Sequence, residues 1–86
     1  MMYNYQDEKP KLFTEDNQIK FLKIRDNVQK LLKQSGAVRM QEAMSNVGGD
    51  TWVLMACVDR LAELKEIVEI PTNYAGQYRV FTSNYN

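Results

Sequence analysis

The sequence predicts an α+β domain, because two runs with helical periodicity precede two β-rich runs. Apolar residues recur at steps of three and four over residues 15–34 and again over 51–66, which is the pattern of a helix with one buried face. The runs 67–70 and 77–82 are rich in β-branched and aromatic residues and flank a turn-rich segment, which is typical of a β-hairpin. The 86 residues correspond to one domain.

The first residues follow neither period, and Pro10 interrupts them. A stretch without a period is expected to form no regular element. We expect Leu12 and Phe13 to be pinned onto the domain. The predicted organisation has three parts: a flexible N-terminal arm over residues 1–13, the folded domain over 14–82, and a C-terminal tail over 83–86.

The first predicted helix, over 15–34, begins after Thr14, which suits the N-cap position. Ser35 and Gly36 end it. Ile19 falls on the outer side of this helix. Its inward stripe consists of Phe21, Ile24, Val28, Leu31 and Leu32.

A short edge strand and a short helix follow. Residues 37–39 are too few for an independent strand, so we expect them to pair at the edge of a sheet. The short helix spans 40–46, and Gly48 and Gly49 break the chain after it. Its inward candidates are Ala43, Met44 and Val47.

The second long helix is capped by Asp50 or Thr51 and runs to about Glu66. Its apolar stripe, spaced as one helix face, consists of Val53, Leu54, Cys57, Val58, Leu61 and Leu64. The opposite face carries Trp52, Met55, Ala56, Asp59, Glu63 and Glu66, with Arg60 at its border.

Two stretches of the sequence carry a family resemblance. The stretch "SGAVRMQEAMSNVGGDTWVLMACVDRLAELKEIVEI" resembles the edge strand, second and third helices and first wing strand of winged helix-turn-helix transcriptional regulators of bacteria. The stretch "AGQYRVF" is similar to their returning wing strand. The resemblance covers residues 15–82 and implies a single winged helix-turn-helix domain, with three helices and a C-terminal β-hairpin wing.

The sequence departs from this family after the second long helix. The family commonly has a glycine there, whereas this chain has Lys65. A left-handed backbone is strained in a residue other than glycine. We therefore expect the helix to continue to Glu66 before it turns.

The outer face of this helix decides between two functions. The resemblance implies a DNA-binding transcriptional regulator, in which this face would read the major groove. Here the face carries Asp59, Glu63 and Glu66, whose charges repel phosphates. If the chain binds double-stranded DNA, we expect the contacts to come from Thr51, Arg60, Arg39, Tyr74 and Arg79.

The alternative function is a protein-interaction module on the same scaffold. Trp52, Met55 and Ala56 would form an apolar centre with Asp59 at its acidic rim, for a partner protein or a second copy. Trp and Met are enriched at the cores of interfaces. Three interpretations of Trp52 stay open: packing back onto the short helix over 40–46 or the N-terminal arm, an exposed interface, and contact with DNA bases.

Composition and short motifs limit which other functions we expect of this chain. Eleven basic and eleven acidic residues cancel, whereas nucleic-acid-binding domains usually carry a net positive charge. With no histidine and a single cysteine, Cys57, we expect no metal site. The chain has no glycine-rich phosphate loop and no nucleophile paired with a base. We therefore expect no enzyme activity, no cofactor and no small-molecule ligand.

Cysteine content and hydropathy also predict the location. The start of the chain is polar, and no apolar run approaches the roughly 20 residues that span a bilayer. We expect no membrane partner. A lone thiol, which the inward stripe places in the core, fits a reducing cytoplasm.

Overall fold

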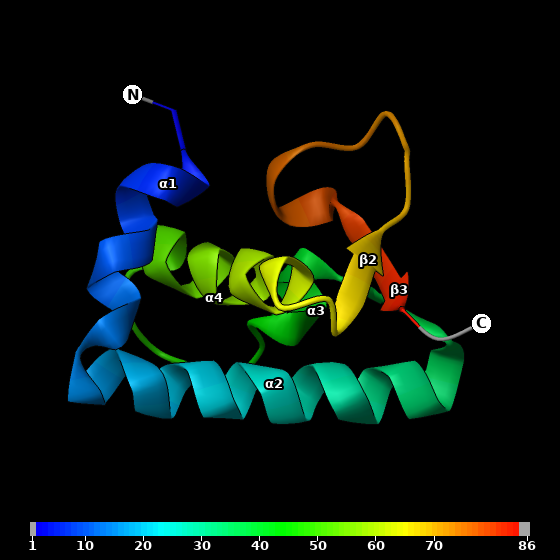
Figure 1. The fold of residues 1–86 in the computed structure, drawn as a ribbon. Coiled ribbons are helices and arrows are strands. Elements are labelled where there is room, and N and C mark those ends of the chain that lie inside the picture. Colours follow the sequence, from blue (N-terminus) through cyan, green and yellow to red (C-terminus); the bar gives the residue numbers. More distant parts are fainter. Residues whose placement is uncertain (1, 85–86) are drawn as a thin grey trace.

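The computed structural model describes residues 2–84, which form four α-helices and a three-stranded antiparallel sheet (Figure 1). The predicted α+β class is therefore confirmed, with one helix more than expected. The α-helices are α1 (Tyr5–Glu8), α2 (Glu15–Ser35), α3 (Met40–Ala43) and α4 (Thr51–Glu63). The strands are β1 (Ala37–Arg39), β2 (Ile67–Glu69) and β3 (Val80–Ser83), and two 3-10 turns are η1 (Lys9–Phe13) and η2 (Gly76–Tyr78).

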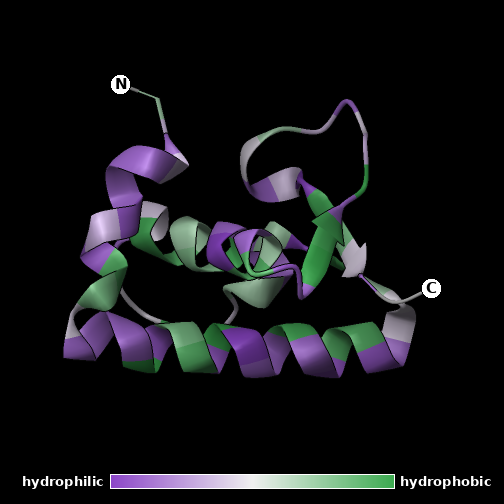
Figure 2. Cartoon of the chain, in the orientation of Figure 1, coloured by the Kyte–Doolittle hydropathy of each residue, from purple (hydrophilic) through white to green (hydrophobic). Residues whose placement is uncertain are grey.

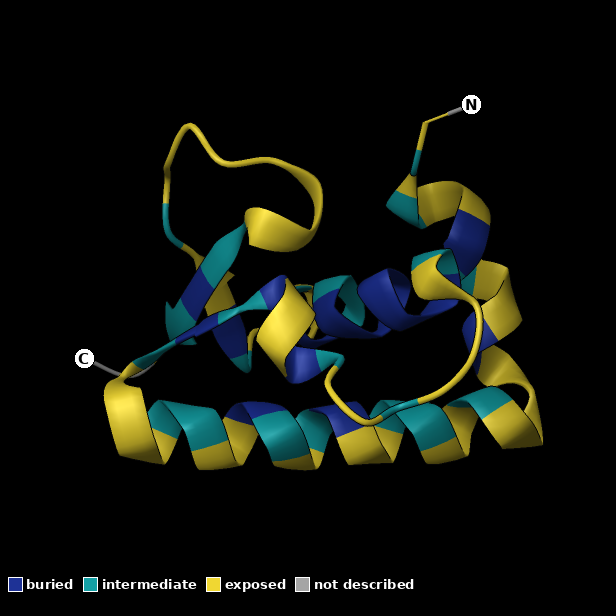
Figure 3. Cartoon of the chain, turned by 180° about the vertical axis from the view of Figure 1, so that it is seen from behind, coloured by how far each residue is buried: buried dark blue, intermediate teal, exposed yellow. Residues whose placement is uncertain are grey.

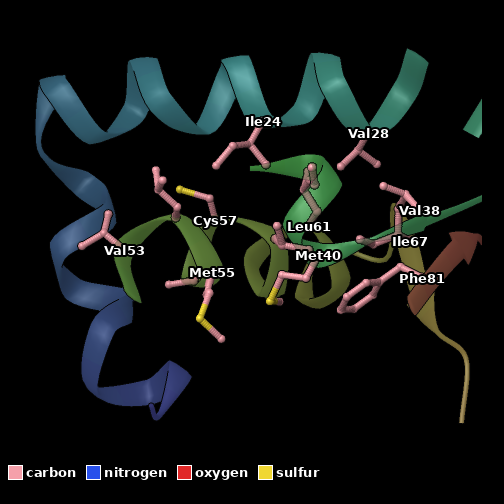
Figure 4. Close-up of a cluster of buried hydrophobic side chains, with 14 of the residues drawn as sticks. Ile24, Val28, Val38, Met40, Val53, Met55, Cys57, Leu61, Ile67 and Phe81 are labelled. Carbon is pink, nitrogen blue, oxygen red and sulfur yellow. The ribbon is translucent and has the colours of Figure 1, made fainter. Parts of the chain in front are cut away.

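Helix α2 lies along one side of the molecule and matches the predicted helix (Figure 1). The Thr14 hydroxyl accepts a hydrogen bond from the Asn17 amide at 3.2 Å, so Thr14 is the N-cap as expected. Gly36 ends the helix with a left-handed φ of 77°, which glycine adopts without strain. Ile24 and Val28 are buried and point from α2 toward α4 (Figure 4).

The three strands form a sheet in the order β1-β3-β2. Val38 pairs with Phe81 and Val68 pairs with Thr82, so residues 37–39 do form an edge strand. Strand β3 begins later than predicted because η2 occupies Gly76–Tyr78. It extends to Ser83, inside the predicted tail, and residues 85–86 of that tail lie outside the described residues.

Helix α4 begins where the sequence indicated and ends earlier. The Asp50 carboxylate accepts hydrogen bonds from the Trp52 and Val53 amides, so Asp50 is the cap. The helix ends at Glu63 rather than Glu66, because Lys65 adopts the left-handed conformation with a φ of 67°. The expectation that a lysine would avoid this conformation is wrong.

The N-terminal segment is not the irregular arm that the missing period suggested. The Asn4 side chain caps α1, and η1 follows directly. Both elements pack against α4, and Figure 2 shows that α1 is largely hydrophilic. Leu12 is 1% exposed and joins the core as expected, whereas Phe13 is exposed. Periodicity cannot detect elements this short, because each has only four or five residues.

The core lies between α2, α4 and the sheet (Figure 4). The predicted inward residues of α4 are buried except Leu64, which is 44% exposed because it lies beyond the last helical turn. Cys57 is fully buried, and burial raises the pKa of its thiol to about 11. Within the described residues, no helix combines the length and the hydropathy needed to cross a bilayer.

Candidate functional site

Helix α4 is covered on both of its sides. Figure 4 shows Cys57 on the side that faces α2 and Met55 pointing to the opposite side. α1 and η1 also pack against α4, and Tyr3 and Tyr5 bond to its Asp59 and Glu63. Met55 is 4% exposed and Ala56 is fully buried, so the predicted apolar centre of an exposed patch is wrong for these two residues. The sequence predicts one apolar packing face for α4, and the structure buries residues on the opposite face as well.

Trp52 packs back onto the N-terminal segment. Its ring meets the Tyr3 ring edge-to-face, with centroids 6.4 Å apart and an interplanar angle of 70°. Trp52 is partly buried against the core. Of the three interpretations of Trp52, the structure supports packing onto the N-terminal arm.

Asp59 joins the N-terminal segment to the sheet. Its carboxylate accepts a hydrogen bond from the Tyr3 hydroxyl at 2.6 Å and two from the Arg79 guanidinium at 2.6 and 3.3 Å. Arg79 also donates to Glu69 on β2 at 3.0 and 3.1 Å. The predicted role of Asp59 as the acidic rim of an exposed patch is therefore wrong, because this carboxylate is occupied inside the chain.

A second connection joins the same segment to α4 at Glu63, one turn beyond Asp59. Glu63 accepts hydrogen bonds from the Tyr5 hydroxyl at 2.7 Å, the Lys9 ammonium at 2.9 Å and the Arg60 guanidinium at 2.7 Å. The bonds from Lys9, then Tyr5 and Arg60, lower the pKa of this carboxyl to about 2. The Tyr5 hydroxyl has a raised pKa, because burial and then the bond to Glu63 disfavour its anion.

Two of the residues expected to contact DNA, Arg60 and Arg79, form ion pairs with carboxylates of this chain. Arg60 pairs with Glu63 and lies over the Phe13 ring at 5.6 Å. Burial of Arg79 acts to lower its pKa, but the hydrogen bonds to Glu69 and Asp59 outweigh it, so the pKa is raised. Releasing Arg79 to a phosphate would leave Asp59 and Glu69 without a cation, which is costly because the Asp59–Arg79 pair is partly buried. Releasing Arg60 would leave Glu63 with Lys9 alone.

The loop between β2 and β3 is the largest exposed segment away from these connections (Figure 3). No charged residue occurs from Pro71 to Tyr78. Tyr74 is 53% exposed and Tyr78 is 58% exposed. The Arg39 guanidinium lies 5.0 Å from the centroid of the Tyr74 ring and donates to the Tyr78 carbonyl at 3.4 Å. We call Arg39, Tyr74 and Tyr78 the loop surface.

The five residues proposed for DNA contact do not form one face. Arg39 and Tyr74 are in contact. Thr51 is exposed at the first position of α4, about 13 Å along the helix axis from Arg60 at 1.5 Å per residue. The side chain of Arg79 turns to Asp59 and Glu69. The structure therefore keeps only Arg39, which is half-buried, and the exposed Tyr74 together.

Tyr3 and Tyr5 were not among the predicted site residues, although they hold α1 on α4. One signal was present, since Asp59 and Glu63 stand four residues apart on one helix face. Nothing in the local sequence, however, connects that face to tyrosines more than 50 residues earlier.

Comparison with known proteins finds no match. The chain matches no family model, no curated protein and no solved structure. Among residues 2–84, no three side chains of His, Cys, Asp or Glu gather in an arrangement that could hold a metal ion.

Proposed function

We propose that the chain is a winged-helix domain that recognises another protein through its loop surface, and that it does not read DNA with α4. The winged-helix assignment is supported by the element order α2-β1-α3-α4-β2-β3 and by the sheet order β1-β3-β2. A fold of this kind does not fix a function, so the function is argued from the surfaces.

The observation that carries the proposal is the covering of α4. A groove-reading helix needs an exposed face with base-contacting side chains. On the outer face of α4, Asp59 and Glu63 are instead bonded to Tyr3 and Tyr5 of the N-terminal segment. Met55 and Ala56 on the same helix are buried. Arg60 on α4 and Arg79 before β3 are paired with carboxylates, so neither cation is free for phosphates.

The loop surface has the composition of a protein-binding surface. Tyr and Arg are the residues enriched at the energetic centres of protein interfaces. Tyrosine buries a large rigid area at a small entropic cost, and the uncharged Thr, Asn, Gly and Gln residues of the loop add adaptable hydrogen bonding. Arg39 already orients the Tyr74 ring, so the surface is partly organised before binding.

Site-specific photocrosslinking tests this proposal. A benzophenone amino acid replaces Tyr74 in the full chain, and the matched control replaces Lys23, which is exposed on α2. In cells that naturally contain the chain, we expect protein adducts from position 74 and not from position 23, with Arg39→Ala reducing their yield. Nucleic-acid adducts from position 74, or equal protein yields at both positions, would contradict the proposal.

A direct titration tests the second part of the proposal, that the chain does not read DNA with α4. Fluorescence anisotropy with mixed-sequence duplex DNA at low salt is expected to show binding no tighter than about 100 μM, the weak end of non-specific binding. A tighter complex whose affinity falls steeply with added salt would restore DNA recognition.

A further inference from the structure

A hollow of about 590 Å³ lies between the C-terminal half of α2 and the junction of α4 with β2. Its apolar lining comes from Val28 and Leu32 on α2, Leu61 on α4 and Ile67 on β2. Lys33 and Lys65 also line it, as does the end of β3. The volume is within the roughly 300–1,000 Å³ of small-ligand sites.

The charges around this hollow are unbalanced. Arg25 pairs with Glu66 at 2.8 Å, so these two lining residues neutralise each other. Lys33 and Lys65 form no ion pair within residues 2–84. The lining therefore carries two uncompensated positive charges in a chain whose formal net charge is zero.

The backbone of Lys65 is left-handed where α4 ends. This lysine holds a φ of 67°, a conformation that costs a residue with a Cβ about 1–2 kcal/mol. Strained residues of this kind persist where the surrounding structure enforces them, and they cluster at ligand-binding sites. Here the strained residue is also a cation on the rim of a hollow.

We propose that this hollow binds a small carboxylate that carries a short apolar group. The apolar group contacts Leu32, which is half-buried, above the buried side chains of Val28, Leu61 and Ile67. The carboxylate lies toward the ammonium groups of Lys33 and Lys65. This site is at the end of β2 and β3 remote from the loop surface, so it is independent of the proposed function.

The test uses 3-phenylpropionate as the probe and 3-phenylpropanol, its neutral counterpart, as the matched control. Two-dimensional amide NMR of the full chain is expected to show shifts at Leu32, Lys33, Lys65 and Ile67 that saturate with the acid. The alcohol is expected to bind at least about threefold more weakly, because it forms no ion pair. Equal binding of acid and alcohol, or shifts confined to other residues, would overturn the proposal.

Three variants separate binding from folding. Lys33→Gln and Lys65→Gly are each expected to weaken binding of the acid by about three- to fivefold. Lys65→Gly also removes the backbone strain, so its loss of binding cannot be attributed to a loss of stability. Lys30→Gln, on the same helix but outside the lining, is expected to bind as the unaltered chain does. Unchanged binding in both Lys33→Gln and Lys65→Gly would refute the proposal.

Discussion

Helices α2 and α4 are both amphipathic, yet they bury very different shares of their residues. α4 buries seven of its 13 residues, whereas α2 buries two of its 21. α2 forms one outer side of the molecule, while α4 lies between α2 and the α1–η1 segment (Figure 1). A periodic pattern therefore identifies a helix and its first packing face, but not a second segment that packs against the other face.

The largest effect is expected from a charge placed on the covered face of α4. Met55→Lys places an ammonium at a position that is 4% exposed, which is expected to lower the free energy of unfolding by about 3 kcal/mol or more. Ile19→Lys on α2 is the matched change at a 49% exposed position and is expected to change it by less than about 0.5 kcal/mol. Urea denaturation of both variants measures the contrast, and equal effects would mean that the N-terminal segment does not cover α4 in solution.

A smaller effect is expected from breaking the connection at Asp59. Asp59→Ala leaves the Tyr3 hydroxyl without its acceptor and Arg79 with Glu69 alone. We expect a loss of about 2 kcal/mol, less than for a fully buried pair because Glu69 still balances Arg79. Asp26→Ala on the outer face of α2 is the control and is expected to cost less than about 0.5 kcal/mol. A loss at Asp59 no larger than the control would show that the connection does not stabilise the fold.

The connection at Glu63 predicts a pH dependence. Its pKa in the folded chain is about 2, below the ordinary value of 4.5, so ionised Glu63 favours the folded state. This contribution is complete above about pH 4.5 and is lost as the pH falls toward 2. The difference in melting temperature between the unaltered chain and Glu63→Gln is therefore expected to shrink over that interval. If the two melting temperatures differ by the same amount from pH 7 down to pH 2, the lowered pKa of Glu63 is contradicted.

The sequence was informative where a structural feature depends on neighbouring residues. The stop at Gly36 is local and was predicted, and the cap of α4 was narrowed to Asp50 or Thr51. The covering of α4 depends on hydrogen bonds from Tyr3 to Asp59 and from Tyr5 to Glu63, across more than 50 residues. Neither helical periodicity nor a capping residue indicates such long-range contacts. The residues of the candidate site could therefore not be predicted as well as the fold.

Contacts between distant residues also affect how α4 ends. Changes at the ends of α2 and α4 are expected to have the smallest effect on the free energy of unfolding. Both helices finish at a left-handed residue, Gly36 after α2 and Lys65 after α4. Tertiary packing holds Lys65 in a conformation that its own side chain disfavours, since the Asn84 side chain donates to its carbonyl at 2.8 Å. Lys65→Gly is therefore expected to raise the free energy of unfolding by about 0.5–1 kcal/mol, and Gly36→Lys to lower it by a similar amount. If urea denaturation shows Lys65→Gly to be destabilising, contacts of the lysine side chain outweigh its backbone strain, and the two helix ends are not equivalent.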